Sequence, residues 1–155
     1  PLRAYSTLPF RSRSLSMKIG AEDVLKSPKW PEKFPFSPID FGREDESTDT
    51  AFYDYPRLVY HIDEFAVKAL KDFYAENLGD DRDILDVCSS WVSHFPNGVK
   101  YGKRVGLGMN EYELSQNPQL DEYFVQDLNQ NPTFPFSDDS FDAITCVVSV
   151  DYLID

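Results

Sequence analysis

The fold of this chain is decided by Phe141-Asp142-Ala143-Ile144-Thr145-Cys146-Val147-Val148-Ser149-Val150, an apolar run that follows an acidic loop. A shorter apolar run, residues 123–127, precedes that loop. Continuous apolar runs are typical of parallel strands that are buried on both faces of a sheet. We therefore expect a parallel strand over Phe141–Val150, with an outer edge that needs cover from outside these 155 residues.

Further strands and turns are expected upstream of this run. In chain order they are strand Ile84–Cys88, a turn through residues 89–96, strand Val105–Gly108, a short helix Glu111–Gln116 that Asn117-Pro118 ends, and strand Tyr123–Asp127. Strands that alternate with helical turns indicate right-handed crossovers between parallel neighbours. The sequence therefore predicts an α/β fold with the first four strands of a Rossmann-like, doubly wound parallel sheet.

A long helix is predicted before the sheet, over Pro56–Leu78. Apolar residues recur there at steps of three and four and are expected to share one face: Leu58, Ile62, Phe65, Ala66, Ala69, Leu70 and Phe73. Pro56 suits a first helical turn, and Gly79 suits the position after the helix end. Asp63 and Glu64 are interpreted as solvated helix charges.

Two segments with different compositions precede this α/β domain, which is assigned to residues 56–155. Residues 1–20 contain Arg3, Arg11, Arg13 and Lys18, many serines and no acid, which resembles an organelle transit peptide. Residues 21–55 form an arm rich in proline, which disfavours helix. A short helix near Ala21–Lys26 is the one regular element expected in the arm.

The aromatic side chains of the arm are its candidate anchors. They include Trp30, Phe34, Phe36 and Phe41, which we interpret as partner-binding residues. Proline-rich extended segments press such rings into pockets of other surfaces. Three alternatives remain open: the arm embraces its own domain, docks on a partner protein, or is disordered.

Composition limits the classes of function. The length of 155 residues and an apolar content of 41% suit one core. A net charge of −12 argues against a nucleic-acid surface. No run approaches the about 18 apolar residues of a membrane helix, so we expect a protein that is soluble or peripheral to a membrane. Cys88 and Cys146 fall in predicted strands and are expected to be buried, reduced thiols.

Four motifs lie in order between Phe41 and Leu153: Asp45-Glu46-Ser47 with Phe52-Tyr53 and Pro56-Arg57; Asp86-Val87-Cys88-Ser89-Ser90-Trp91-Val92-Ser93-His94; Gly106-Leu107-Gly108-Met109-Asn110-Glu111; and Asp121-Glu122-Tyr123-Phe124-Val125-Gln126-Asp127-Leu128-Asn129 with Phe136-Ser137-Asp138-Asp139-Ser140-Phe141-Asp142. Together they resemble the motifs of class I S-adenosylmethionine-dependent methyltransferases, in particular the first half of a divergent type 11-like branch found in bacteria and photosynthetic eukaryotes. The resemblance implies methyl transfer, with the cofactor over the carboxyl ends of the strands.

The resemblance also implies which residues meet the cofactor. The candidates are Asp86, Ser89, Ser90, Asn110 and Asp127. Asp86 matches the acid that begins the first motif and would orient the turn after the first strand. Asp127 stands where the family has an acid that contacts the adenine amine; alternatively, it caps the turn before Asn129.

The chain departs from the family pattern at two places. Cys88, Ser90 and Val92 stand where the pattern has three glycines, so a positive φ at any of them costs about 1 kcal/mol or more. Gly108 stands where the family has the acid that binds the ribose hydroxyls, which leaves Asn110 or Glu111 as substitutes. S-adenosylmethionine is therefore the one cofactor expected, at a site whose glycine motif is degenerate.

No catalytic or metal-binding residue is assigned. His61 has no carboxylate or cysteine at ligand spacing and is interpreted as a packing or hydrogen-bonding residue. His94 lies near Cys88, but no third group would orient a nucleophile–base pair, so a loop contact is favoured. No spacing suggests zinc, and Asp138, Asp139 and Asp142 lack the glycine and order of a calcium loop.

Two hypotheses for the function follow. In the preferred one, a methyltransferase-derived half-domain is a non-catalytic subunit that docks on other protein subunits of a plastid complex, such as a photosystem, on the stromal side of the thylakoid. A mitochondrial matrix location is the second choice. In the alternative, the protein continues beyond Asp155 and the whole is an S-adenosylmethionine-dependent methyltransferase.

Overall fold

The computed structural model describes residues 25–42, 44 and 47–153 and divides the chain into two units, Pro1–Glu44 and Asp45–Asp155. The transit-peptide-like segment and most of the helix expected near Ala21–Lys26 lie outside the described residues. In the first unit, the 3₁₀ helix η1 (Pro38–Phe41) begins after Ser37, whose amide and hydroxyl both donate to Asp40. The prediction of an extended arm is therefore wrong at Pro38–Phe41.

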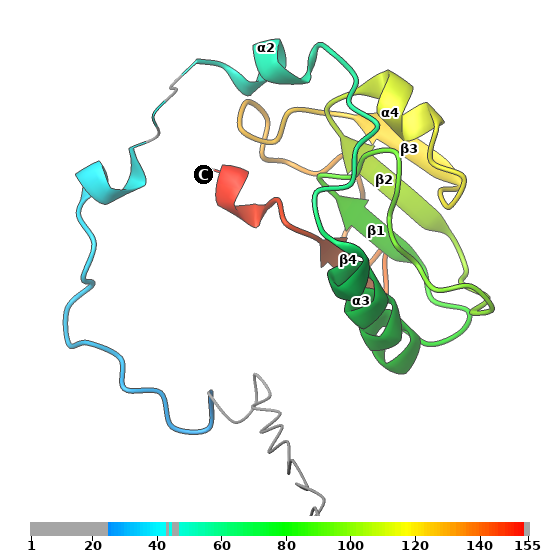
Figure 1. Ribbon diagram of the computed structural model, residues 1–155, viewed down its shortest axis with the longest axis horizontal. Helices are drawn as coiled ribbons and strands as arrows, with labels where there is room; N and C mark the ends of the chain where they lie inside the picture. The colour runs from blue at the N-terminus through cyan, green and yellow to red at the C-terminus, as the bar shows by residue number, and fades with distance from the viewer. Residues whose placement is uncertain (1–24, 43, 45–46, 154–155) are drawn as a thin grey trace, which may run out of the picture. The chain divides into compact units, whose positions relative to one another are not determined.

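Four parallel strands form the sheet of the second unit, as the sequence predicted. They are β1 (Ile84–Val87), β2 (Arg104–Gly108), β3 (Glu122–Val125) and β4 (Ala143–Cys146), in the order β3-β2-β1-β4 (Figure 1). In the register, Leu85 lies between Val105 of β2 and Ile144 of β4. The chain order reverses between β1 and β4, which is the switch point of a doubly wound sheet. The fold is α/β and consistent with a partial Rossmann-like sheet.

Short helical elements and one longer helix connect the strands of the second unit or flank them in sequence. They are α2 (Asp49–Tyr53), α3 (Glu64–Asn77), α4 (Glu111–Ser115) and the 3₁₀ helix η2 (Val150–Tyr152). Among residues 25–42, 44 and 47–153, none of the helices has the length and apolar character that crossing a membrane requires.

The core consists of two clusters, because neighbouring residues of a strand point to opposite faces. On one face, Ile84 packs with Tyr74 of α3 and with Phe95. On the other, Leu85, Val87, Val105 and Leu107 form a cluster with Phe124, Phe136 and Phe141 packed against it. Burying each large apolar side chain stabilises the fold by roughly 1.5–3 kcal/mol.

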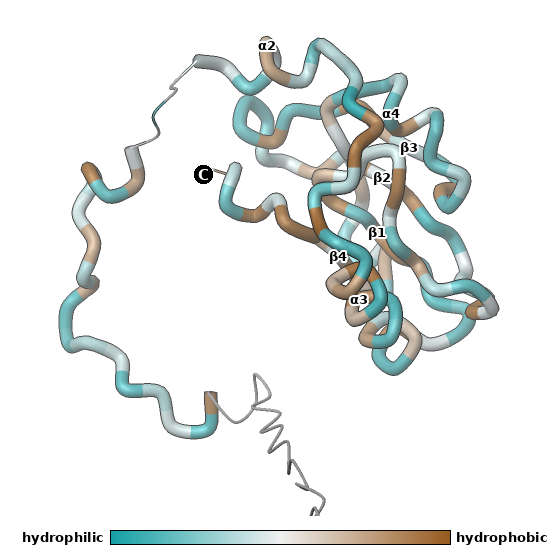
Figure 2. Tube along the Cα trace, in the orientation of Figure 1, coloured by the Kyte–Doolittle hydropathy of each residue, from teal (hydrophilic) through white to brown (hydrophobic). Residues whose placement is uncertain are grey.

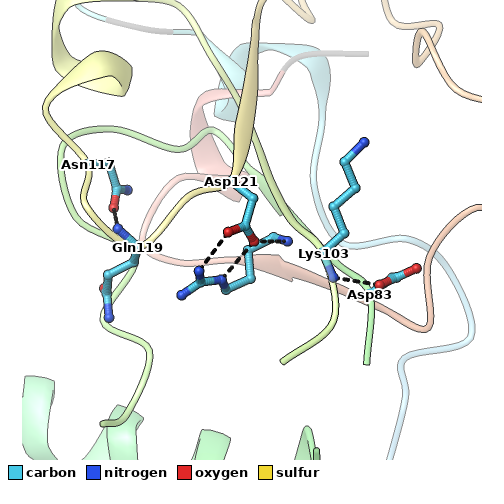
Figure 3. Close-up of polar contacts among 6 residues, drawn as sticks. Asp83, Lys103, Asn117, Gln119 and Asp121 are labelled. Carbon is cyan, nitrogen blue, oxygen red and sulfur yellow. Dashed lines mark hydrogen bonds and ion pairs between the residues drawn. The ribbon is translucent and has the colours of Figure 1, made fainter. Parts of the chain in front are cut away.

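Carboxylates fix the amino ends of the strands (Figure 3). The carboxylate of Asp121 accepts from the amide of Arg104 and from its guanidinium, over 2.8 to 3.0 Å. Asp83 accepts from the amide of Lys103 over 2.6 Å. Gln119 donates its amide hydrogen to Asn117 over 3.0 Å, which closes the turn before β3. These bonds set the starts of β2 and β3 against β1.

The predicted long helix is wrong at its start. Helix α3 begins at Glu64, and residues 56–63 are not helical, because Asp63 is the N-cap and accepts from the amide of Ala66 over 2.8 Å. Asp63 is exposed, as predicted for a solvated charge, and it also caps the helix. Gly79, with a φ of 68°, does follow the helix end.

The predicted apolar face of this helix is also wrong in part. Phe65 and Phe73 are exposed, at 77% and 57%, whereas Tyr74 is buried against Ile84. Leu70 and Leu78 pack beside Tyr74. The buried face of α3 is thus rotated from the expected one and follows Val67, Leu70, Tyr74 and Leu78.

The last predicted strand is shorter than expected. Strand β4 ends at Cys146, Val148 has a φ of 49°, and residues 150–152 form η2. A positive φ breaks a strand, so the prediction of one strand to Val150 is wrong. Strand β3 likewise ends at Val125, before Asp127. The apolar run therefore forms a strand, a turn and a helical turn.

Candidate functional site

A cavity of about 600 Å³ opens at the carboxyl ends of the strands. It is lined by the segments that follow β1, β2, β3 and β4 and by residues of the segment 49–62 that leads into α3. This place lies at the switch point between β1 and β4, where ligands bind in open α/β sheets. All five predicted cofactor-binding residues line the cavity: Asp86, Ser89, Ser90, Asn110 and Asp127.

The turn after β1 has a glycine-like conformation at its first residue. Cys88, which the resemblance aligns with the first glycine of the family pattern, has a φ of 54°. The amide of Ser89 donates to the carbonyl of Leu107 over 2.9 Å, which holds the turn against β2. A non-glycine residue in this region costs about 1–2 kcal/mol, so the surrounding contacts stabilise a strained turn.

Asp86 is a buried carboxylate that holds this turn. It accepts from the hydroxyls of Ser89 and of Thr145 on β4, both over 2.7 Å. Burial raises the pKa of Asp86, and hydrogen bonds from Ser93, Ser89 and Thr145 lower it to a lesser degree. Asp86 thus ties the turn to β1 and β4.

Gly108 lies against the turn so closely that no side chain fits. A Cβ atom on Gly108 would lie 2.1 Å from the carbonyl oxygen of Ser89 and 3.3 Å from a methyl group of Leu114. Contacts below 3 Å to backbone atoms require the backbone to move. The acid that binds ribose hydroxyls in the resembled family is therefore sterically excluded at this position.

The predicted substitutes for that acid have other partners. Asn110 is the N-cap of α4, where it accepts from the amide of Glu113 over 3.0 Å and donates to the carbonyl of Tyr53 over 2.7 Å. Glu111 is exposed and does not line the main cavity; it lines a second, shallower depression. Asn110 thus uses its side chain for contacts within the protein, and Glu111 lies outside the main cavity.

Glu113 is a site residue that the sequence analysis missed. It is buried at the cavity wall, where it accepts from the hydroxyl of Ser90 and from the amide of Arg57, each over 2.6 Å. The pattern Asn-x-x-Glu at residues 110–113 resembles a capping box and was a usable signal for a carboxylate directed toward the start of α4. The partners from residues 57 and 90 have no sequence signal.

Asp127 caps a turn, which is the alternative that the sequence left open. Its carboxylate accepts from the amide of Asn129 and from the side-chain amide of Gln130, both over 2.9 Å, and from the hydroxyl of Thr50 over 3.3 Å. Asn129 in turn donates to Asp49 over 2.8 Å. These bonds connect the segment after β3 with α2, so the two segments form one wall of the cavity.

The aromatic wall of the cavity lies beside the loop after β1. The indole of Trp91 donates to the carbonyl of Val59 over 3.0 Å, and the ring centroid of Tyr60 lies 4.8 Å from that of Trp91. The ring centroid of His94 lies 5.9 Å from that of Tyr60. Burial, together with the charge of Lys71, lowers the pKa of His94. A neutral imidazole is thus packed in the wall.

The cysteines do not match the expectation of two buried thiols. Both are free, but Cys146 is exposed and only Cys88 is partly buried. Burial raises the pKa of Cys88 to about 12, which keeps the thiol protonated at neutral pH. A protonated thiol is a poor nucleophile.

Within the described part of the chain, no group of three or more His, Cys, Asp or Glu side chains lies together as metal ligands would.

The predicted partner-binding residues of the arm lie in the first unit and are exposed: Trp30, Phe34, Phe36 and Phe41. The rings of Phe34, Phe36 and Phe41 contact one another, with centroids 5.6 to 6.1 Å apart.

The fold and the cavity together define a partial Rossmann-like α/β unit with a hollow at its switch point. Comparisons of the chain with protein families, with curated proteins and with solved structures find no match.

Proposed function

We propose that this chain is a methyltransferase-derived, non-catalytic subunit that binds other proteins of a larger complex. The observation that carries the proposal is the close approach of Gly108 to Ser89. A Cβ atom added to Gly108 would lie 2.1 Å from the carbonyl oxygen of Ser89, which leaves no room for the ribose-binding acid. A class I methyltransferase without that acid lacks the main polar contact to the ribose of its cofactor.

The polar groups around the cavity support the same proposal. Ser90 and Glu113 bond to each other, Asn110 bonds to Tyr53, and Asp127 bonds to its own turn. Binding a cofactor through these groups would break bonds within the protein, and each buried group left without a partner costs about 1–3 kcal/mol. The carboxyl edge thus fits a structural role better than a catalytic one.

The exposed apolar residues support a role in protein binding. Phe65 and Phe73 on α3 and Ile144 on β4 are more than half exposed. Large aromatic residues are enriched in protein–protein interfaces, so Phe65 and Phe73 are candidates for contact with a partner. A location on the stromal side of a plastid, at a thylakoid complex such as a photosystem, remains a prediction from the arginine- and serine-rich residues 1–20.

The test is the thermal stability of the full chain with S-adenosylmethionine and with S-adenosylhomocysteine. A ligand that binds only the native state at 100 times its Kd stabilises by about 2.7 kcal/mol, which a melting curve detects. The proposal predicts no change of Tm at millimolar concentrations of either compound. A saturable rise of Tm would overturn the non-catalytic assignment.

A second experiment tests the subunit role. The full chain, expressed in a photosynthetic cell, is expected to migrate with a larger complex on a native gel. A variant that keeps residues 1–20 but has Trp30, Phe34, Phe36 and Phe41 replaced by Ala is expected to migrate apart from it. A full chain that migrates alone contradicts the proposal.

An S-adenosylmethionine-dependent methyltransferase is the second candidate, favoured by one observation. The cavity of about 600 Å³ lies at the switch point, and Cys88 retains the positive φ of a glycine turn there. This candidate predicts the rise of Tm that the first excludes, together with transfer of a labelled methyl group.

A further inference from the structure

The two cysteines of the chain are neighbours at the carboxyl ends of β1 and β4. In the register of these strands, Cys146 is the partner of Val87, and Cys88 directly follows Val87. With strands about 4.8 Å apart and a rise of about 3.3 Å per residue, a residue one step beyond the partner has its Cα about 6 Å away. A disulfide needs a Cα separation of about 4.4–6.8 Å, so the backbone positions suit one.

The backbone conformation of Cys88 places its side chain on the face that Cys146 occupies. Successive side chains of a strand point to opposite faces, so a regular strand would put Cys88 on the face opposite Val87. With a φ of 54°, Cys88 instead packs against the cluster that contains Val87, and Cys146 shares the face of its partner Val87. The two thiols form a hydrogen bond with each other. The strained turn therefore brings the two sulfur atoms together.

The surroundings of the pair favour a disulfide over free thiolates. Cys88 packs against an apolar cluster, and Figure 2 shows the hydrophobic colour where the chain leaves β4, directly after Cys146. Burial raises the pKa of Cys88 to about 12 and also raises the pKa of Cys146. A dithiol whose thiolate is stabilised stays reduced easily, and this pair has no such stabilisation, whereas a disulfide carries no charge.

We propose that Cys88 and Cys146 are a redox modification site, at which exchange with a small-molecule disulfide such as oxidised glutathione forms a reversible bond between β1 and β4. In the first step the thiolate of Cys146, the more exposed of the two, attacks one sulfur of oxidised glutathione, breaks its S–S bond and releases one glutathione thiolate. The thiolate of Cys88 then attacks the sulfur of Cys146 and releases the second glutathione thiolate. The protein loses two protons and two electrons, and oxidised glutathione gains them as two molecules of glutathione.

The bond ties the turn after β1 to the end of β4. This turn carries Ser89 and Ser90, which line the cavity, and its first residue has a strained backbone. The ring that the bond closes runs from residue 88 to residue 146 and includes β2, α4 and β3. Oxidation is therefore expected to stabilise the sheet and to hold the cavity wall in place.

The test equilibrates the full chain in mixtures of reduced and oxidised glutathione, blocks free thiols with N-ethylmaleimide and measures the mass of the intact protein. The expected product is a monomer that has lost two hydrogen atoms and takes up no maleimide; because the chain has two cysteines, this product identifies the bond. The same equilibrium in urea is the reference. The folded chain is expected to hold its disulfide against a reducing ratio about tenfold or more higher than the unfolded chain does. Unreacted thiols, glutathione adducts without ring closure, a disulfide-linked dimer, or an equal ratio in urea overturns the proposal.

A matched variant tests whether the fold brings the thiols together. Cys146→Ser combined with Ile144→Cys keeps two cysteines and moves one thiol two residues back along the same face of β4, to a Cα about 11 Å from that of Cys88. This separation is too long for a disulfide, so glutathione adducts without ring closure are expected. Ring closure as complete as in the wild-type chain overturns the assignment to this pair.

Thermal unfolding of the wild-type chain measures the consequence. The oxidised chain is expected to melt about 5 °C or more above the reduced chain, because the bond restricts the unfolded chain. Cys88→Ser, treated with the same glutathione mixture, is expected to show no such rise. An oxidised wild-type chain that melts at or below the temperature of the reduced chain overturns the proposal. The result does not depend on whether S-adenosylmethionine changes the Tm, so its failure and the failure of the proposed function are separate results.

Discussion

The hydroxyl of Ser90 donates a hydrogen bond of 2.6 Å to Oε2 of Glu113, which joins the turn after β1 to helix α4. The other carboxylate oxygen accepts from the amide of Arg57, also over 2.6 Å. One buried side chain therefore holds three segments of the cavity wall, although the segments are far apart in the sequence.

Glu113→Ala is expected to destabilise the fold by about 1–3 kcal/mol, because it removes a buried carboxylate and leaves the hydroxyl of Ser90 and the amide of Arg57 without their acceptor in two partly buried hydrogen bonds. Chemical denaturation monitored by circular dichroism measures the effect. Glu111→Ala, at an exposed position two residues away, is the control and should change stability by less than about 0.5 kcal/mol. Equal effects would show that the bonds of Glu113 contribute nothing specific.

Gly108→Asp restores the acid of the resembled family but is expected to destabilise the fold by about 3 kcal/mol, because its Cβ would lie 2.1 Å from the carbonyl oxygen of Ser89. Neither this variant nor Gly108→Ala should gain binding of S-adenosylmethionine in a thermal shift assay. Gly42→Ala is the control, since its Cβ would meet its nearest atom at 3.4 Å. A stable Gly108→Asp chain that binds the cofactor would contradict the exclusion of the acid.

The strands were predictable from the sequence because each is a short, mostly apolar segment that follows a charged residue. The strand ends were less predictable. Val147 and Val148 continue the apolar pattern of β4, yet the positive φ of Val148 depends on its surroundings and not on its residue type. The start of α3 was missed because Leu58 and Ile62 fit the helical spacing, while the cap at Asp63 fixes the start at Glu64.

The position of the site was predictable, but the bonds within it were not. The carboxyl ends of parallel strands meet at one edge, so Asp86, Asn110 and Asp127 were expected together and are found together. The sequence does not encode locally that Glu113 bonds to Ser90. Nor does it show that Ser89 approaches Gly108, because both contacts depend on how α4 packs on the turn.

Asp86→Asn is expected to gain stability relative to the wild type as pH rises. Burial raises the pKa of Asp86 in the folded chain above its unfolded value of about 4, so the folded state binds the proton more tightly. The contribution of Asp86 to stability therefore falls as pH rises from about 4 through the folded pKa and is constant above it. The difference in unfolding free energy between the variant and the wild type, measured over this range, should rise and then level. A constant difference would contradict the raised pKa.

The two thiols are expected to react at different rates with an alkylating reagent. Cys146 is exposed, whereas Cys88 is partly buried and burial raises its pKa to about 12. At pH 8, intact-protein mass spectrometry should detect one added group first, and peptide mapping should place it on Cys146. Cys146→Ser should remove the fast reaction, and Cys88→Ser should leave it. A fast reaction at Cys88 would contradict the protonated, shielded thiol.

Val148→Gly is expected to leave the fold unchanged or to stabilise it by up to about 1 kcal/mol. Val148 has a φ of 49°, a region that costs a residue with a Cβ about 1–2 kcal/mol and costs glycine little. Glycine also loses roughly 0.5–1 kcal/mol through its greater freedom in the unfolded chain, so the two effects nearly cancel. Val147→Gly is the matched control and should destabilise by about 1–3 kcal/mol, because Val147 packs against the cluster of Tyr74, Ile84 and Phe95 and has no strain to release. Unfolding free energies of the two variants measure the contrast, and equal losses at both positions would show that the backbone at Val148 is not strained.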